Sequence, residues 1–384
     1  MSYQITQTFP HPLFNDLKKP CISIFFSTHR NPNESQKDII TFKNVLKELE
    51  KKLVDFSTRS EVKKIIQPLI DLQQDQPFWQ NNHEGIAIYL NQDACIIYRL
   101  PVAFETQVHV HDNYYILPLI QYFQHRIMCD VLVLSKTDFS LMTYDTGYTS
   151  ALELPEGVHT NIKDVLGDEK ISAYLAHGSY GGAGGHAMYH GHKDINNEMD
   201  KDVDKYFRYV DAVVNKHISA QRQRPLILVA LPEQQSIFRQ LSDNQYLHEK
   251  GIEQSTQNID EKRLLPLIKS IFVNDFRVKI MARIDQYHQA KGKNLATDHH
   301  HDIAKAARFN NIKTLFIENQ RNIIGHLNLS ATNEEDQPKK KKDILNALVL
   351  FGMQQGVEIL SLDTADMPTK NGVAVIHRFK PKSQ

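Results

Sequence analysis

The chain has 384 residues, of which 41% are hydrophobic and 23% charged, and its 45 basic residues balance its 45 acidic ones. This length suggests two or three domains, and the zero net charge excludes a protein that binds nucleic acid through its overall charge. No apolar run reaches membrane-spanning length and no signal peptide is recognisable, so we expect a cytoplasmic protein. The three cysteines lie far apart inside apolar runs, which favours buried, reduced thiols.

The first block, residues 1–125, is predicted to form an α/β domain. Apolar residues recur at helical spacing in two stretches, and short apolar runs bounded by polar turn residues indicate strands. The predicted elements are a buried strand over 21–27, helices over 35–54 and 60–72, and a hairpin of strands 85–90 and 94–100.

The second block, residues 126–272, combines a strand hairpin with a long amphipathic helix and a second, continuously apolar strand. Acidic residues near the start of the helix suit the positive end of its dipole. A strand without polar positions is typical of burial on both faces of a sheet. The predicted elements are strands 130–135 and 140–145, a helix over 200–220 and a strand over 225–231.

The third block, residues 273–384, again alternates strands and helices, which predicts another small α/β domain. Gly356 follows the last predicted helix, at the position where a left-handed residue commonly ends a helix. The predicted elements are helices over 274–291, 303–309 and 343–355 and strands over 313–318, 357–362 and 373–379.

The most unusual stretch is residues 177–194, HGSYGGAGGHAMYHGHKD, which we call the glycine-rich segment. Six of its eighteen residues are glycine and four are histidine. Glycine at this density does not build a core, but it lets a backbone approach another molecule closely. The segment is therefore the first candidate for a functional site.

Several short motifs, in their order and spacing, make the chain resemble a bacterial homologue of the archaeo-eukaryotic class-1 release factors and Pelota. The resemblance covers nearly the full length and implies an RNase H-like middle domain and a C-terminal domain similar to L7Ae-type RNA binders. The matching pieces are Ser23–Arg30, Phe78–Trp79, Gly85–Ala87, the glycine-rich segment, Lys205–Asp211, Gly356–Leu360, Met367–Pro368 and Gly372–Phe379.

The resemblance implies that the glycine-rich segment acts at the peptidyl transferase centre of the ribosome. Release factors carry a Gly-Gly-Gln tip there, which helps water attack the ester of peptidyl-tRNA. This sequence has Gly184-Gly185-His186 instead. The imidazole of His186 has the chemistry of a base near neutral pH, so Gly184, Gly185 and His186 are the candidate catalytic residues for peptidyl-tRNA hydrolysis.

The implied partners are the ribosome and tRNA or rRNA. Gly181, Gly182 and Lys193 in the glycine-rich segment are candidate RNA contacts. A run of four lysines, Lys339, Lys340, Lys341 and Lys342, forms a local basic patch that suits phosphates. No stop-codon-reading motif is recognisable in the first block, so ribosome rescue or quality control is expected rather than decoding.

Two other functions remain open at this stage. The first is a non-catalytic module that only binds rRNA or tRNA. The second is a metal-dependent nuclease, since RNase H-like folds can host one. His186, His190, His192 and Asp194 have metal-ligand chemistry, but the flanking glycines disfavour a preformed site. We therefore predict no metal and no other cofactor.

Three further groups of polar residues have simpler interpretations. His109 and His111 alternate with valines and are expected on one solvated strand face. Asp298 or Asp302 is expected to cap the helix that follows. Thr28–Arg30 end a strand, where Arg30 has the chemistry to hold a phosphate, but a turn and capping role before Pro32 is favoured.

Overall fold

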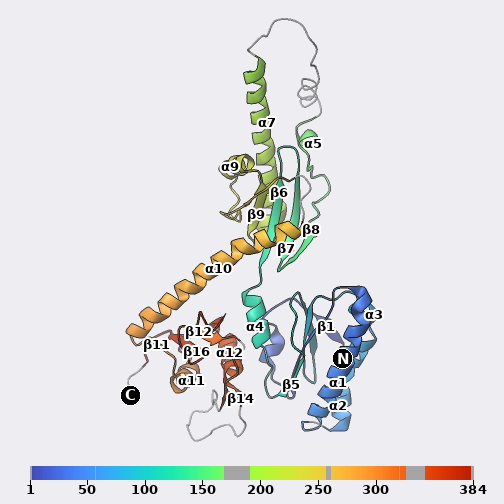
Figure 1. Ribbon diagram of the computed structural model, residues 1–384, viewed down its shortest axis with the longest axis vertical. Helices are drawn as coiled ribbons and strands as arrows, with labels where there is room; N and C mark the ends of the chain where they lie inside the picture. Colours follow the sequence, from blue (N-terminus) through green and yellow to red (C-terminus); the bar gives the residue numbers. More distant parts are fainter. Residues whose placement is uncertain are drawn as a thin grey trace. The chain divides into compact units, whose positions relative to one another are not determined.

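The computed structural model describes residues 2–56, 58–167, 191–256, 261–319, 321–325 and 342–381. The chain divides into two compact units (Figure 1). The terminal unit comprises Met1–His125 and Val278–Gln384, and the middle unit comprises Arg126–Arg277. Helices and three larger sheets alternate along the chain, so the predicted mixed α/β class is confirmed. The finer division into domains 1–125, 126–272 and 273–384 stays a prediction.

The first sheet of the terminal unit has the strand order β1-β4-β3-β2-β5. The predicted hairpin is confirmed, because β3 and β4 pair antiparallel from Gly85 opposite Leu100 to Leu90 opposite Cys95. All three cysteines of the chain are buried and free, as expected. The strands are β1 (Tyr3–Ile5), β2 (Cys21–Ser27), β3 (Gly85–Leu90), β4 (Cys95–Leu100) and β5 (Gln107–His111).

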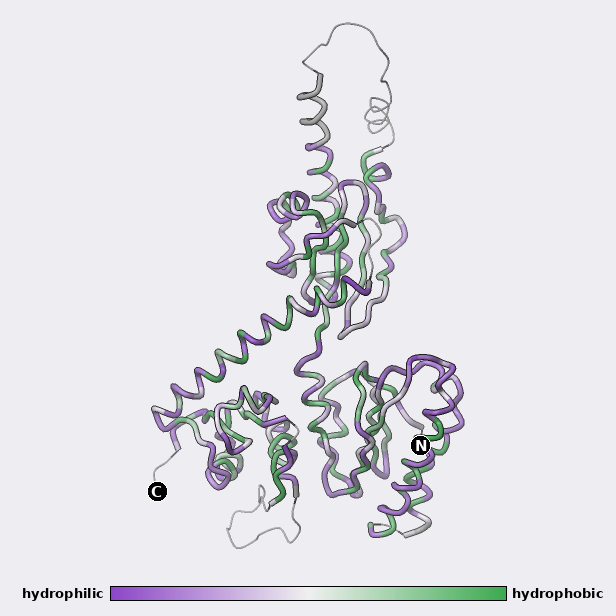
Figure 2. Tube along the Cα trace, viewed as in Figure 1, coloured by the Kyte–Doolittle hydropathy of each residue, from purple (hydrophilic) through white to green (hydrophobic). Residues whose placement is uncertain are grey.

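Helices cover one face of this sheet. Ile22, Ile24 and Phe26 of β2 alternate along the strand and pack against Phe42 and Leu49 of α1. In Figure 2 the strands are largely hydrophobic, and the helices alternate between hydrophobic and hydrophilic residues. The helices of this part are η1 (Pro12–Asn15), η2 (Pro32–Glu34), α1 (Ser35–Leu53), α2 (Arg59–Gln74), α3 (Gln76–Gln80) and α4 (Leu117–Gln124).

The C-terminal part of the terminal unit builds a sheet of order β11-β16-β12-β15 and a small β13-β14 ribbon. Gly356 has φ of +64°, which confirms the predicted left-handed end of the preceding helix. The elements are β11 (Ala296–Thr297), α11 (His300–Arg308), β12 (Ile312–Glu318), β13 (Ile324–Gly325), β14 (Lys342–Asp343), α12 (Ile344–Gln354), β15 (Glu358–Leu362) and β16 (Val373–His377).

The two ends of the chain share one hydrophobic core. The second face of the first sheet, with Phe25 and Tyr89, packs in the same cluster as Leu315, Leu348 and Val375 from the C-terminal part. Each of these five side chains is buried. Because α1 and α2 cover only one face of the first sheet, the C-terminal residues complete the burial of the other.

Two side-chain amides hydrogen-bond to backbone groups across the contact between the first sheet and the C-terminal part. Asn346 accepts a hydrogen bond from Ile116 N at 2.8 Å and donates one to Tyr114 O at 2.8 Å. Gln124 donates to Ser361 O at 2.7 Å and accepts from Ser361 N at 2.6 Å. Each amide thus pairs with the backbone as a neighbouring strand would, and fixes the register of the two parts.

We expect Asn346→Ala to destabilise the terminal unit by about 2–4 kcal/mol, because two buried backbone groups lose their partners. Trp79 is the only tryptophan and is buried in this unit, so its fluorescence follows the unfolding in urea. The control Asn44→Ala, at an exposed position of α1, should change stability by less than about 0.5 kcal/mol. Equal unfolding midpoints for the two variants would show that the hydrogen bonds of Asn346 contribute no stability.

The middle unit has a mixed sheet of order β10-β9-β6-β7-β8. β6 pairs antiparallel with β7 and parallel with β9, so the predicted hairpin and the predicted apolar strand lie side by side. The strands are β6 (Met128–Leu134), β7 (Phe139–Asp145), β8 (Tyr148–Ala151), β9 (Leu226–Ala230) and β10 (Ile252–Glu253).

Helices pack on both faces of this sheet. Leu132 and Leu134 of β6 share a cluster with the buried side of α7, whereas Val131 and Val133 face a cluster that includes Leu264 of α10. The predicted helix over 200–220 is α7 (Gly191–Val214), a π-helical turn (Asn215–Ser219) and α8 (Ala220–Arg222). The other helices are α5 (Ile162–Leu166), α9 (Pro232–Leu241) and α10 (Glu261–Gly292), which begins well before the predicted residue 274.

A buried ion pair joins the end of this helical stretch to the sheet. Asp130 on β6 is 1% exposed, and its two carboxylate oxygens accept hydrogen bonds from Arg222 Nε at 3.1 and 3.0 Å. Arg222 also donates to Thr143 Oγ1 on β7 at 3.0 Å. The guanidinium therefore ties two strands to α8.

We expect Asp130→Ala to lower the free energy of unfolding of the middle unit by about 1–3 kcal/mol, because Arg222 loses its counter-charge but is 29% exposed and keeps Thr143. Circular dichroism during thermal unfolding checks this. Glu156→Gln, at an exposed turn, is the control and should shift the transition very little. Comparable melting of both variants would show that the pair contributes no stability.

Candidate functional site

Most of the residues predicted to act on RNA lie outside the described residues. These are Gly181, Gly182, Gly184, Gly185 and His186 of the glycine-rich segment, the possible ligand His190, and Lys339, Lys340 and Lys341 of the lysine run. Lys193 lies in α7 and Lys342 in β14, where only the backbone is described. Their proposed roles stay predictions.

The described elements on either side of residues 168–190 are held together by the first buried turns of α7. Tyr206 donates its hydroxyl hydrogen bond to Thr160 O at 2.6 Å, and His159 N donates to the Tyr209 hydroxyl at 3.0 Å. Ile162 of α5 packs in the same hydrophobic cluster as Val203. Residues 159–162, at the start of α5, are therefore held against α7. These contacts fix the segments that precede and follow residues 168–190.

Three cationic side chains lie on the exposed face of α7 from residue 200 onward, where Asp204 is half-buried. Lys201, Lys205 and Arg208 are all exposed and follow one another at intervals of four and three residues, so they share a helix face. Lys205 pairs with Asp202 at 3.1 Å, whereas Lys201 and Arg208 have no ion-pair partner among the described residues. Asp200 is an exposed acidic residue at the start of this stretch. We call Lys201, Lys205 and Arg208 the cationic face.

No role for Lys201, Lys205 and Arg208 was predicted from the sequence, although the helical pattern after the glycine-rich segment leans cationic. The apolar positions of the predicted helix identified the buried side, and the cations occupy the opposite side at helical spacing. A chain with zero net charge can still carry a local positive surface, which is what phosphate binding requires.

The residues at the end of β2 have structural partners, but the favoured capping role is wrong, because Asn31 is the N-cap of η2 and Glu34 that of α1. His29 N donates to Asp38 Oδ2 at 3.0 Å, and its imidazole Nδ1 lies 2.6 Å from Asp38 Oδ1. Thr28 donates to His83 O at 2.8 Å. Arg30 lies 3.3 Å from Glu84, so this end of the sheet is joined to the start of α1 and to the loop before β3.

The predicted cap of α11 is wrong. The N-cap of α11 is His299, with no side-chain cap, and neither Asp298 nor Asp302 takes that position. Asp298 instead accepts hydrogen bonds from Asn371 at 3.1 Å and from Lys291 at 3.3 Å. The hydrogen bonds from Asn371 and Lys291 thus hold the Asp298 carboxylate away from the helix start, where its local sequence position favours a cap.

The histidines of β5 do not form a uniformly solvated face, which corrects the prediction of one solvated face for His109 and His111. His111 is exposed, but His109 is half-buried and its ring stacks on Tyr115 with the centroids 4.2 Å apart. Burial, and to a lesser degree the charge of His111, lower the pKa of His109 to about 4. Its aromatic partner Tyr115 lies outside β5, in the segment that follows it, so the alternation within β5 did not reveal the contact.

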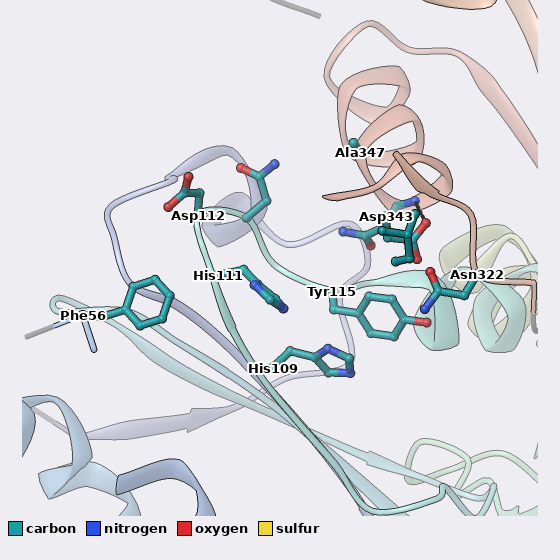
Figure 3. Close-up of a pocket in the computed structure, with 11 residues that line it drawn as sticks. Phe56, His109, His111, Asp112, Tyr115, Asn322, Asp343 and Ala347 are labelled. Carbon is teal, nitrogen blue, oxygen red and sulfur yellow. Dashed lines mark hydrogen bonds between the residues drawn. The ribbon is translucent and has the colours of Figure 1, made fainter. Parts of the chain in front are cut away.

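A pocket with a volume of about 200 Å³ opens beside these rings within the terminal unit (Figure 3). Its aromatic lining comes from Phe56, His109 and Tyr115, and its polar lining includes Asn322 and Asp343. The pocket thus joins β5 and the segment after it to the start of α12. Most of its lining surface is apolar, with a few polar groups.

Asp343 is the most unusual group of this pocket. Its Oδ1 atom accepts hydrogen bonds from Leu345 N at 2.9 Å and Asn346 N at 3.4 Å and so caps α12. Its Oδ2 atom is buried and has no hydrogen-bond partner among the described residues. Burial raises the pKa of Asp343 above its usual range, although the two backbone donors oppose this shift.

Within the described residues, no group of three histidine, cysteine, aspartate or glutamate side chains has the arrangement of a metal site. The candidate ligands His186 and His190 lie outside these residues, and only the backbone of His192 and Asp194 is described. Among the described residues, no helix combines the length and hydropathy that crossing a bilayer requires.

Residues 129–273, which include the glycine-rich segment and α7, match the model of the family described as bacterial archaeo-eukaryotic release factor family 6. The predicted resemblance to archaeo-eukaryotic release factors is confirmed. The match covers β6 to β10 and the start of α10, that is, nearly the whole middle unit. No curated protein sequence matches the chain.

Solved structures of release-factor-like proteins also match the chain. A model of ribosome-bound archaeal Pelota and ABCE1 matches over 96% of this chain and 93% of the other, with 10% identity and a TM-score of 0.42. Dom34 of S. cerevisiae, described as a translation termination-like factor, matches over 78% and 74%, with 12% identity and a TM-score of 0.38. The archaeal translation termination factor aRF1 matches over 96% of both chains, with 13% identity and a TM-score of 0.22.

The lowered pKa of His109 predicts a pH-dependent loss of stability. The unfolded chain binds a proton near pH 6.5, whereas the folded chain does so only near pH 4, so acidification between these values favours unfolding. From pH 7.5 to 4.5 we expect wild type to lose about 2 kcal/mol more unfolding free energy than His109→Gln in urea titrations. At pH 7.5 the two should differ only through packing on Tyr115, and parallel pH profiles would contradict the assignment.

Proposed function

We propose that this protein is a cytoplasmic, ribosome-associated factor that acts in translation termination, rescue or quality control. The observation that carries the proposal is the release-factor family match over residues 129–273. This range contains the glycine-rich segment, where the family match and the unusual composition coincide. The absence of a recognisable stop-codon-reading motif in residues 1–125 favours rescue or quality control over decoding.

The proposal includes a three-domain organisation with boundaries near residues 125 and 272. An RNase H-like fold for the middle domain is supported by its mixed five-stranded sheet with helices on both faces. An L7Ae-like fold for residues 273–384 is supported by the small sheet β11-β16-β12-β15 with α11 and α12 packed beside it.

In this proposal the glycine-rich segment enters the peptidyl transferase centre. Gly184 and Gly185 would let the backbone approach the ester of peptidyl-tRNA, and His186 would orient or deprotonate the attacking water. Because histidine replaces the glutamine of the release-factor tip, a second possibility is that the segment binds there without promoting hydrolysis.

RNA binding would be shared among three groups of residues. Gly181, Gly182 and Lys193 would contact tRNA or rRNA from the glycine-rich segment, and Lys339–Lys342 would contact phosphates from the terminal unit. The cationic face of α7 adds Lys201, Lys205 and Arg208, which lie in the family-matched range and are exposed. Phosphate contacts of this kind weaken as salt concentration rises.

We expect the purified protein to cosediment with ribosomes at low salt and the triple variant Lys201→Glu, Lys205→Glu, Arg208→Glu to bind at least about tenfold more weakly. The variant should also show a smaller salt dependence, because fewer phosphates are neutralised. A matched triple variant, in which exposed Lys43, Lys47 and Lys51 of α1 become Glu, should bind almost as wild type does. No association of wild type with ribosomes or tRNA at low salt would overturn the proposed function.

Release of a labelled peptide from peptidyl-tRNA on the ribosome separates the two roles of the glycine-rich segment. If His186 acts on water, wild type releases peptide and His186→Ala does so at least about tenfold more slowly, while both bind equally well. Binding of wild type without release would establish the non-catalytic role and end the hydrolytic one.

A further inference from the structure

Two exposed phenylalanines lie near each other where α11 and β16 end, in the C-terminal part of the terminal unit (Figure 1). Phe309 is 68% exposed and Phe379 is 57% exposed, whereas no other described phenylalanine exceeds 38%. Single exposed apolar side chains are common, but neighbouring large ones are typical of a binding surface. We call Phe309 and Phe379 the ring pair.

The backbone beneath the ring pair is fixed by one buried side chain. Asn311 donates from its amide to Phe379 O at 3.0 Å and accepts from Phe379 N at 2.9 Å. Asn310, with φ of +51°, turns the chain out of α11, and Asn311 N then donates to Ala306 O at 2.8 Å. The exposure of both rings therefore belongs to the fold and is not the result of a frayed chain end.

Three exposed cationic side chains accompany the ring pair. Lys313 follows Ile312, whose carbonyl oxygen accepts a hydrogen bond from Arg378 Nε at 2.8 Å. Lys380 is the residue directly after the second ring. Arg378 also donates to a backbone carbonyl at the end of α12, at 2.9 Å. None of the three cations has an ion-pair partner among the described residues, so their charges remain available to a ligand.

Few carboxylates oppose these charges. Glu358, which lies opposite Thr314 in the sheet, is paired with Arg283 at 2.9 Å. Asp302 is exposed on α11, two helical turns before Phe309, which is about 10 Å along the helix axis. Three cations against one such carboxylate leave the surface around the ring pair positively charged, and this favours an anionic ligand.

Positive charge around exposed aromatic rings is the combination that binds single-stranded nucleic acid. Unpaired bases stack on aromatic faces while cations neutralise the phosphates between them. A duplex keeps its base faces covered, and an acidic peptide matches the charges without a flat group for each ring. Single-stranded RNA therefore matches both features of this surface.

We propose that the ring pair stacks on unpaired bases of RNA and that Lys313, Arg378 and Lys380 contact the adjoining phosphates. The inference rests on the proposed ribosomal function for the source of the RNA. It differs from the lysine run and from the cationic face of α7 in what is recognised, because those surfaces offer charge alone, whereas the ring pair also requires bases that are not paired.

Fluorescence anisotropy at low salt tests the proposal with a labelled RNA strand of about 12 nucleotides and a mixed-sequence RNA duplex of the same length. We expect the full chain to bind the single strand, and the double variant Phe309→Ser, Phe379→Ser to bind it at least about tenfold more weakly, because two stacking contacts are lost. Duplex binding depends on phosphates and should change by less than about twofold.

Two control variants show whether aromatic faces at this place are required. The double variant Phe309→Tyr, Phe379→Tyr keeps both faces and should bind the single strand within about twofold of wild type. Phe56→Ser removes the next most exposed described phenylalanine and should change the binding of neither RNA. All these side chains are exposed, so thermal unfolding followed by Trp79 fluorescence should differ little between the variants.

Cosedimentation with ribosomes separates this inference from the proposed function. If wild type binds the single strand but not ribosomes, the ribosomal function is wrong and the stacking surface stands. If the double serine variant binds the single strand as wild type does, or loses duplex binding to the same extent, the stacking surface is wrong even where ribosome binding is intact. The first of these two results would assign the ring pair to a protein partner instead.

Discussion

The structure depends on one constraint: the first sheet has two apolar faces, and its own helices cover only one of them. Ile22 and Ile24 meet α1 and α2, whereas Phe25 and Tyr89 meet side chains from the C-terminal part. The chain must therefore return after the middle unit to complete the core that it began. Hydrophobic burial alone does not fix how the two parts align. Asn346 and Gln124 do so, because their side-chain amides bind specific backbone groups.

This arrangement separates two kinds of surface. The terminal unit, built from both ends of the chain, encloses an aromatic pocket beside Asp343. The middle unit carries the release-factor family match and the cationic face of α7. A balanced total charge thus does not exclude a local group of cations, such as the one on α7, which suits ligands that carry phosphates.

Periodicity predicted the elements well because it reports burial directly. The β3–β4 hairpin, α1 and the double-sided strand β9 lie within a residue or two of their expected bounds. The cap of α11 was predicted wrongly because Asn371, 73 residues away, binds Asp298. The environment of His109 was predicted wrongly because Tyr115, which follows β5, stacks back on its ring. The pocket was unpredictable for the same reason. The cationic face could be predicted from helical spacing. The predicted role of the glycine-rich segment is based on its composition and on the family resemblance.

The most direct test of the account is to map where residue 186 lies on a ribosome. The three native cysteines are buried, so His186→Cys provides a selective attachment point for an iron chelate that cleaves nearby RNA. The account predicts cleavage of large-subunit RNA confined to the peptidyl transferase centre and lost when the bound protein is displaced by salt. Cleavage elsewhere on the ribosome, or none from a bound and labelled protein, would contradict it.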